Sequence, residues 1–444
     1  MINEARLQWK IEKKKDTFKL TKIFGKMDGK GLLRFTTAGS VDDGKSTLIG
    51  RLLYDSKSIF EDQLESISEF SKKKGNAEID LSLLTDGLRA EREQGITIDV
   101  AYRYFSTPKR KFIIADTPGH IQYTRNMVTG ASTADLAVIL IDVRNGVTEQ
   151  TIRHTYIAKL LDLKHIIYCV NKMDLLNYKQ DAFENVKTEI EELSLNLDVT
   201  NYSIIPISAK YGDNVVSRSK NMEWFPGDNL LSLLENLEIS NNIEKSLTRF
   251  PVQYVIRPNN DEFHDFRGYA GRLSGGKFIV GQEVCVLPSM HKTKINEIVE
   301  YQTYLESASD GDSIIITLED DIDISRGDLI VPLNELPNIS KEIMATICWF
   351  NEKPLQLKGK YLIRMQTSET KAVIDDLIYK IDINNLEKNY EFKSLSMNDI
   401  GLIKIRTANY VFTDDYLLNH VTGSFIIVDP NTNETVAAGM IQNS

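Results

Sequence analysis

The sequence predicts an α/β domain with a mostly parallel sheet and helices on both faces, followed by two antiparallel β-barrels. Two observations predict this order. In the first half of the 444 residues, short and almost continuous apolar runs alternate with helical patterns, as in a parallel sheet whose strands are buried on both faces. After Phe250, short strand-like runs are split by Gly, Pro, Asn and Asp, which is typical of antiparallel barrels.

The chain begins with a Lys-rich stretch, residues 1–30, which we expect to be a solvated extension. It has charges where a secretion signal needs an apolar core, although its Lys residues could touch an acidic partner. The α/β domain is expected over residues 31–241. Its predicted strands lie at 32–39, 111–116, 135–143, 165–174 and 202–209, and its helical patterns include 46–55 and 182–197.

The remaining length suits two barrels, which we place at residues 242–335 and 336–444. The first barrel has strand-like runs at 250–258, 266–273, 277–288 and 312–320. The second has them at 342–350, 359–367, 400–408, 423–429 and 435–441. The stretch "GRLSGGK", Gly271 to Lys277, lacks the spacing of a phosphate loop and is expected to be a barrel turn.

Composition narrows the class of protein. The formal net charge of -10 argues against broad, sequence-independent nucleic-acid binding, which depends on basic surface, so no nucleic-acid partner is expected. Three scattered Cys residues predict reduced, mostly buried thiols. No apolar run approaches the ~20 residues needed to span a bilayer. We therefore expect a cytoplasmic protein without membrane contact.

One motif predicts a phosphate site. The stretch "GSVDDGKS" fits G-x-x-x-x-G-K-[ST], and it follows a predicted strand and precedes a predicted helix, the context in which the motif is meaningful. Backbone N–H groups and the helix N-terminus would hold the phosphates, Lys45 would add a charge, and the Ser46 hydroxyl would ligate Mg²⁺. The phosphate-binding residues predicted here are Gly39, Ser40, Val41, Asp42, Asp43, Gly44, Lys45, Ser46 and Thr47.

Two carboxylates inside a loop for a polyanion need an explanation. The middle positions of such a loop contribute amides, so their side chains can point outward. Asp43 is expected to be solvated or to act as a local cap. Asp42 is either solvated or helps to hold a monovalent cation beside the phosphates. Val41 adds an apolar wall that would crowd an incoming arginine finger, so slow intrinsic hydrolysis is expected.

Later motifs select the nucleotide. In "FIIADTPGH", Asp116 ends a buried strand, where it can hold the Mg²⁺ shell, commonly through water, and the Gly119 amide can reach the γ-phosphate. A carboxylate at Asp174 can accept two hydrogen bonds from guanine, whereas adenine would leave it unpaired. The predicted guanine-binding residues, from "NKMD" and "SAK", are Asn171, Lys172, Asp174, Ser208, Ala209 and Lys210. Together the motifs predict a GTP site.

Hydrolysis and switching are assigned to three residues, Lys45, Thr97 and His120. Thr97 is the candidate that reaches Mg²⁺ and the γ-phosphate in the GTP state and releases them afterwards. His120 directly follows the "DTPG" stretch, where it could orient the attacking water. The nearby "EREQ" is more simply read as a solvated charged turn than as part of the switch.

The phosphate loop, "GITID", "DTPGH" and "NKMD", followed by two barrels, resemble the translational GTPase superfamily. Longer stretches resemble one branch of it, the large subunit of heterodimeric sulfate adenylyltransferase. They are "GSVDDGKSTLIGRLLYD", "LLTDGLRAEREQGITIDVAYRYFST", "KRKFIIADTPGH", "QYTRNMVTGASTADLAVILIDVRNGV", "EDDIDISRGDLIV" and "GSFIIVDPNTNETVAAGMI". The resemblance covers about Gly31 to Gln442. Ile121 departs from it, because the family pattern has an acidic residue after "DTPGH".

The resemblance implies a GTPase paired with a small catalytic subunit. In that family the small subunit makes adenosine 5′-phosphosulfate and pyrophosphate from ATP and sulfate, and GTP hydrolysis is coupled to this transfer. Some members carry a fused kinase for the product. No second phosphate loop follows the second barrel here, which leaves open whether a separate adenylylsulfate kinase is a partner. The alternatives are a translation factor that delivers aminoacyl-tRNA and a scaffold with an inactive GTPase fold.

Overall fold

The computed structural model describes residues 31–57, 81, 99–120, 124–239, 246–257, 266–301, 303–383 and 385–442. Thr97, Ile121, the "EREQ" stretch and the predicted N-terminal extension lie outside these residues. The chain forms two compact units. The first contains the residues up to Gly119 together with Thr129–His154 and Leu163–Ile239, and the second contains His120–Val128, Thr155–Asp162 and the residues from Ser240 onward.

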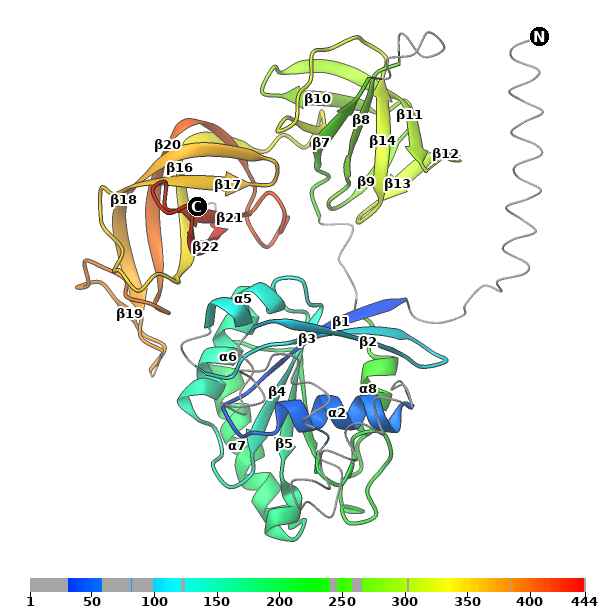
Figure 1. Cartoon of the computed structure of the whole chain (residues 1–444), viewed down its shortest axis with the longest axis vertical. Helices are drawn as coiled ribbons and strands as arrows, with labels where there is room; N and C mark the ends of the chain where they lie inside the picture. The colour runs from blue at the N-terminus through cyan, green and yellow to red at the C-terminus, as the bar shows by residue number, and fades with distance from the viewer. Residues whose placement is uncertain are drawn as a thin grey trace, which may run out of the picture. The chain divides into compact units, whose positions relative to one another are not determined.

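The first unit is built on a six-stranded sheet with the strand order β2-β3-β1-β4-β5-β6 (Figure 1). Five strands are mutually parallel, and only β2 runs antiparallel to its neighbour β3. The strands are β1 (Leu32–Ala38), β2 (Ala101–Ser106), β3 (Lys111–Asp116), β4 (Leu136–Asp142), β5 (His165–Asn171) and β6 (Tyr202–Pro206).

Helices follow the parallel strands, as the alternating pattern predicted. Helix α2 (Lys45–Asp55) and the shorter α8 (Leu230–Asn236) supply buried leucines to one core with β1 and β3. This packing fixes the start of α2 at the carboxyl end of β1, where the connecting loop is short. The other helical elements are α5 (Thr124–Ala131), α6 (Glu149–Leu160), η3 (Met173–Leu176) and α7 (Gln180–Asn196).

The second unit contains two closed six-stranded antiparallel barrels. In the first barrel the ring runs β10-β15-β7-β8-β14-β11 and closes by pairing β11 with β10. Its ring strands are β7 (Phe250–Ile256), β8 (Gly268–Arg272), β10 (Glu283–Leu287), β11 (His291–Glu300), β14 (Ser313–Leu318) and β15 (Leu329–Pro332). The short strands β9 (Lys277–Ile279), β12 (Thr303–Leu305) and β13 (Ser307–Ser309) complete it.

The second barrel closes in the same way. Its ring runs β17-β21-β22-β16-β20-β18, and β18 pairs with β17. The strands are β16 (Asn338–Trp349), β17 (Lys360–Met365), β18 (Ser368–Ile381), β20 (Ile400–Thr413), β21 (Ser424–Val428) and β22 (Thr435–Ile441), with the two-residue β19 (Lys388–Asn389) at one edge. In each barrel the inward residues form a separate apolar core.

A buried ion pair joins the two barrels. Arg249, just before β7, is fully buried and donates from Nε and Nη2 to the two carboxylate oxygens of Asp414, at 2.7 and 2.8 Å. Asp414 follows β20 and also accepts from the Thr422 hydroxyl. Removing both charges from water costs free energy, and the bidentate hydrogen bonds offset this cost.

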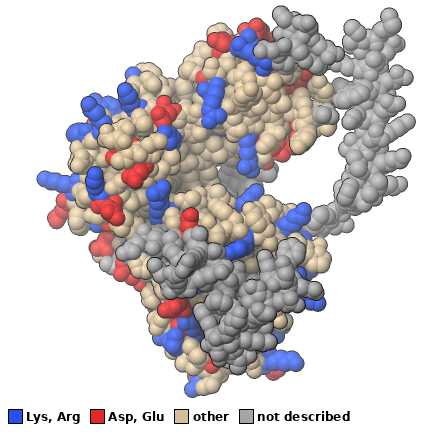
Figure 2. Space-filling model, in the orientation of Figure 1, with Lys and Arg blue, Asp and Glu red and all other residues tan. Residues whose placement is uncertain are grey.

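The predicted fold class is confirmed. The three Cys residues are buried and form no disulfide, and Gly271 to Lys277 connects β8 to β9. The strands β2, β11, β12, β13, β15, β18 and β19 were missed. Among the residues described, no helix is long and apolar enough to cross a membrane. On the face shown in Figure 2, Lys and Arg side chains are interspersed with Asp and Glu.

Candidate nucleotide-binding site

The loop between β1 and α2 has the backbone of a phosphate cradle. Gly39, Asp42 and Gly44 have positive φ angles of 147°, 68° and 95°, and left-handed residues are common in loops whose N–H groups form an anion-binding concavity. A side chain at Gly44 would meet the Asn171 amide, because a Cβ there would lie 2.6 Å from Nδ2. The loop therefore requires glycine here for both conformation and space.

The two carboxylates of the loop have different environments. Asp42 is exposed, as expected for a side chain that points outward. Asp43 is buried and accepts a hydrogen bond from the Ser40 N–H at 2.6 Å, so the expectation of an outward side chain is wrong for Asp43 and the local cap is correct. Burial raises the pKa of Asp43, while the Ser40 N–H and the Lys45 charge lower it.

Lys45 is the buried cation of the site. Its Nζ donates to the carbonyl oxygens of Gly39 at 2.8 Å and Ser40 at 2.9 Å. Burial lowers the pKa of Lys45 below its usual value, and nearby carboxylates, Asp116 first, act against this. Among the described residues, no carboxylate forms an ion pair with it. Two carbonyl dipoles and carboxylates that form no direct ion pair compensate a buried ammonium incompletely, so an anion at this point would be favoured.

The "DTPG" segment lies directly against the loop. Asp116, 1% exposed at the end of β3, accepts from the Thr37 hydroxyl at 3.3 Å, and the Thr117 hydroxyl donates to the Thr37 carbonyl at 2.6 Å. A Cβ at Gly119 would collide with Lys45 Nζ and the Gly39 carbonyl. The Gly119 backbone thus stands beside the predicted position of the phosphates.

Asn171 connects the phosphate loop with the predicted base pocket. Its Nδ2 donates to the Asp43 carbonyl at 2.7 Å, and its Oδ1 accepts from the Ala209 N–H at 2.9 Å. Both bonds are buried and join segments that are far apart in sequence. The "NKMD" and "SAK" motifs and the phosphate loop are consequently one hydrogen-bonded assembly.

The remaining "NKMD" and "SAK" residues are also held in place. The Ser208 hydroxyl donates to Asp174 Oδ1 at 2.7 Å. From α2, Arg51 donates through Nε to the Ala209 carbonyl at 3.3 Å and through Nη2 to the Lys210 carbonyl. The predicted guanine-binding groups therefore lie together at the carboxyl ends of β5 and β6, the edge where open α/β sheets bind ligands.

Three residues near the site, Thr148, His154 and Asp142, were not predicted. The Ser40 hydroxyl lies 3.2 Å from that of Thr148, which ties the phosphate loop to the segment before α6. His154 on α6 is buried; desolvation first, then the charges of Lys45 and Arg153, lower its pKa to about 3. Asp142, at the end of β4, forms an ion pair with Lys172. A local sequence pattern does not reveal these contacts, because each depends on a residue distant in sequence.

Two predicted residues are less defined. Thr97 lies outside the described residues, so its position is not assigned. His120 is described and half-buried, directly after Gly119. Val41 is exposed, and its role as an apolar wall stays a prediction.

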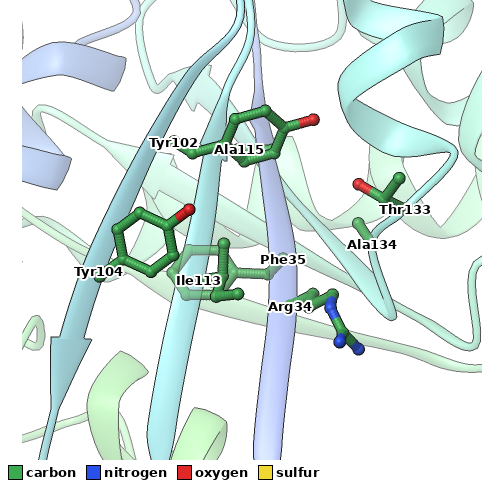
Figure 3. A pocket seen from close by; sticks show the side chains of 8 residues that line it. All are labelled: Arg34, Phe35, Tyr102, Tyr104, Ile113, Ala115, Thr133 and Ala134. Carbon is green, nitrogen blue, oxygen red and sulfur yellow. The ribbon is translucent and has the colours of Figure 1, made fainter. Parts of the chain in front are cut away.

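A hollow of about 240 Å³ lies on the sheet of the first unit and is lined by β1, β2, β3 and the segment after α5 (Figure 3). Tyr102 and Tyr104 of β2 line it, and both are exposed. Its lining includes no residue of the phosphate loop or of the "NKMD" and "SAK" motifs. It is therefore separate from the nucleotide site.

Comparison with families of known proteins identifies two regions. Residues 30–250 match the elongation factor Tu GTP binding domain, and residues 342–442 match the GTP-eEF1A C-terminal domain-like family. The structure resembles the S. cerevisiae Ski7 GTPase-like domain, bound to GDP and inorganic phosphate, with a TM-score of 0.50, 18% identity, and coverage of 94% of this chain and 98% of that one. At that identity the likeness concerns the fold.

Sequence relatives are much closer. Sulfate adenylyltransferase subunit 1 of Aliarcobacter butzleri is 52% identical over 423 residues, which cover 94% of this chain and 88% of the relative. The same subunit of Colwellia psychrerythraea is 50% identical over 419 residues, covering 94% and 89%. The bifunctional enzyme CysN/CysC of Mycobacterium tuberculosis is 50% identical over 411 residues, covering 92% and 67%.

Proposed function

This chain belongs to the sulfate adenylyltransferase subunit 1 family, and from that membership we propose how its nucleotide site contributes to sulfate activation. The chain is the GTPase component of the enzyme. We propose that it binds GTP with Mg²⁺ and couples hydrolysis to the formation of adenosine 5′-phosphosulfate and pyrophosphate from ATP and sulfate. That transfer takes place on a small catalytic subunit bound to it.

One observation carries the assignment of the site. Lys45 is buried beside two carbonyls without an ion-pair partner among the described residues, and Asn171 joins its loop to the "SAK" segment. A single ligand with an anionic end and a base would satisfy both ends of this assembly. GTP has that form, and Asp174 supplies the acceptor that matches guanine N1–H and its amino group.

The residues present fit a magnesium ion. Ser46 in the first turn of α2 and Asp116 at the end of β3 offer hydroxyl and carboxylate oxygens, the donor types that Mg²⁺ prefers. We propose that Ser46 binds the ion directly, Asp116 through water, and Thr97 in the GTP state. When bound, the ion neutralises developing charge on the phosphates. Lys45 and the loop amides of residues 39–47 orient the phosphates for in-line attack.

The attacking water requires a residue of this chain to orient it. We assign this role to His120, since the Gly119 backbone that precedes it lies against Lys45 and the loop. Hydrolysis should be slow until a partner rearranges this histidine and the segment that contains Thr97. Val41, exposed beside the loop, leaves little room for an arginine finger.

A monovalent cation beside Asp42 is a finer proposal. Asp42 is exposed at the outer side of the loop, with a φ of 68°, so its carboxylate is accessible to an ion that offsets phosphate charge. GTP hydrolysis should then depend on the identity of the cation. A rate unchanged when K⁺ is replaced by Na⁺ or by a bulky organic cation would contradict this role.

Coupling requires that the GTP and GDP states bind the catalytic subunit differently. A near-complete switch of a two-state interface needs about 5.5 kcal/mol of differential binding. Thr97 and the segment after His120 are the natural reporters of the γ-phosphate, so we propose that the catalytic subunit contacts both. A cytoplasmic location is also part of the proposal, and the question of a separate adenylylsulfate kinase as a partner stays open.

The test is GTP hydrolysis by the purified chain, with and without the small subunit, in the presence of ATP and sulfate. We expect hydrolysis to need the subunit and both substrates, with matching release of pyrophosphate. Omitting sulfate controls for hydrolysis that is uncoupled. Hydrolysis that ignores the subunit and is stimulated by ribosomes would contradict the proposal and favour a translation factor.

A further inference from the structure

A buried carboxylate outside the recognised motifs lies next to the base pocket. Asp142 is the last residue of β4 and is 2% exposed. In the parallel register its partner on β5 is Asn171, and the Val143 N–H donates to the Asn171 carbonyl at 3.0 Å. Asp142 therefore stands beside the start of the "NKMD" segment.

Four hydrogen atoms from two cationic residues point at this one carboxylate. Arg144 donates its backbone N–H at 3.0 Å and its Nε at 3.0 Å to Oδ1, and its Nη2 at 2.6 Å to Oδ2. Lys172 Nζ lies 2.9 Å from Oδ2. Such charge-assisted bonds are the condition for keeping a carboxylate ionised when it is buried.

Lys172 needs an external partner to hold its conformation. Its φ is 64°, in the left-handed region that residues with a side chain rarely adopt. It lies between Asn171, which braces the phosphate loop, and η3, which contains Asp174. A change at Lys172 would thus move both neighbours, and the ion pair to Asp142 is an interaction that opposes such a change.

We propose that Asp142 is a positioning residue for guanine recognition, holding Lys172 so that Asn171 and Asp174 project correctly into the base pocket. This inference rests on the proposed function of the "NKMD" segment as the guanine site. Asp142 itself acts through Lys172 and does not touch the nucleotide. Arg144 has a supporting role: its side chain is half exposed, and it holds the carboxylate from the solvent side.

The test uses Asp142→Asn in the full chain, with the affinities for GDP and inosine diphosphate as readouts. Inosine lacks the amino group that Asp174 is proposed to bind. We expect the dissociation constant for GDP to rise roughly 2- to 150-fold, the range of coupling between contacting residues. The preference for GDP over inosine diphosphate should fall toward one, an effect that a merely structural loss would not produce.

Asp135→Asn is the matched control. Asp135 is a half-buried carboxylate just before β4, and it accepts from the Arg34 N–H at 2.7 Å, at the opposite end of the strand. This variant should lower the melting temperature and leave the nucleotide preference unchanged. If Asp142→Asn does the same, Asp142 is structural and the inference is wrong.

A double-mutant cycle with Lys172→Ala provides an independent measure. If Asp142 acts through Lys172, adding Asp142→Asn to Lys172→Ala should raise the dissociation constant for GDP less than twofold. Effects that multiply fully would contradict the inference. Failure of the proposed function and failure of this inference give different results. If the wild-type chain binds no GDP, the nucleotide site itself is wrong. If the wild-type chain and the Asp142→Asn variant bind GDP equally well, only the role of Asp142 is wrong.

Discussion

Two buried cations of this chain have opposite surroundings. Arg249, between the barrels, is matched by the carboxylate of Asp414 through two hydrogen bonds. Lys45, in the phosphate loop, donates to two carbonyl oxygens and has no ion-pair partner among the described residues. Burial lowers its pKa, and Asp116 and other nearby carboxylates act against this. The first arrangement is complete within the protein. We expect the anionic phosphates of a nucleotide to complete the second, so the comparison contrasts a charge that stabilises the fold with a charge proposed to bind a ligand.

The largest effect is expected at Arg249. Arg249→Met leaves Asp414 buried without its partner, which should lower the free energy of unfolding of the barrels by about 3–5 kcal/mol. Urea unfolding followed by circular dichroism measures this. Affinity for GDP, by fluorescence titration, should stay unchanged.

The double variant Arg249→Met with Asp414→Leu tests whether the loss of stability comes from the unpaired carboxylate. Replacing both charges by apolar groups should recover most of the lost stability, because no unpaired carboxylate remains. A double variant as unstable as the single one would show that the pair is not self-contained.

Lys45→Ala should have the opposite effect: it should impair nucleotide chemistry and leave stability largely intact. Removing the buried ammonium takes away a charge-assisted contact to the phosphates, and we expect about 10²- to 10³-fold slower GTP hydrolysis in single-turnover assays. The free energy of unfolding without nucleotide should change little. The desolvation cost of the buried ammonium disappears together with its two hydrogen bonds and its attraction to Asp116. A marked loss of stability would mean that Lys45, like Arg249, is structural.

Gly44→Ala tests whether the loop is built around its ligand. The positive φ and the short approach to Asn171 Nδ2 both oppose a side chain, so GDP affinity should fall by about tenfold, at the lower end of the usual cost of such strain. Gly281→Ala is the control. Its φ is 83°, but a Cβ would meet nothing within 4 Å, so it should lose some stability and no nucleotide affinity.

The last prediction concerns the pH dependence of stability. Burial lowers the pKa of His154 from 6.5 to about 3, so the folded state keeps it neutral beside Lys45 while the unfolded state binds a proton below pH 6.5. Stability from this residue is therefore present above pH 6.5 and is lost toward pH 3, by about 1.4 kcal/mol per pH unit at most. His154→Gln should flatten the dependence between pH 6.5 and 5, measured by urea unfolding. If the free energy of unfolding of the variant changed with pH as steeply as that of the wild type, His154 would not be the source of this pH dependence.

The sequence predicted what depends on local pattern. Asp116 and Asn171 were placed at strand ends because each follows a continuous apolar run, and β3 was predicted residue for residue. The strand β2 was missed because Tyr102 and Tyr104 are exposed on one face and no continuous apolar run marks it. In β11 and β18, charged residues alternate with apolar ones and hide the strand in the same way.

The sequence predicted the motif residues of the site but did not predict the contacts that hold them in place. Pattern identified Lys45 and Asp174, but whether Asp43 turns inward depends on the backbone of its own loop. The contact of Asp142 with Lys172 crosses from one strand to the next, and the Arg249–Asp414 pair spans 165 positions. Such contacts follow from the packed fold, which single-sequence reasoning does not supply.

The bridge made by Asn171 has a consequence for how the ligand is bound. One side chain donates to the phosphate loop and accepts from the "SAK" segment, so ordering either segment reduces the entropic cost of ordering the other. Guanosine and pyrophosphate offered as separate fragments should therefore each bind more tightly when the other is present. We therefore expect recognition of the intact nucleotide to be cooperative within a single molecule of ligand, so a triphosphate with the wrong base should lose affinity at both ends.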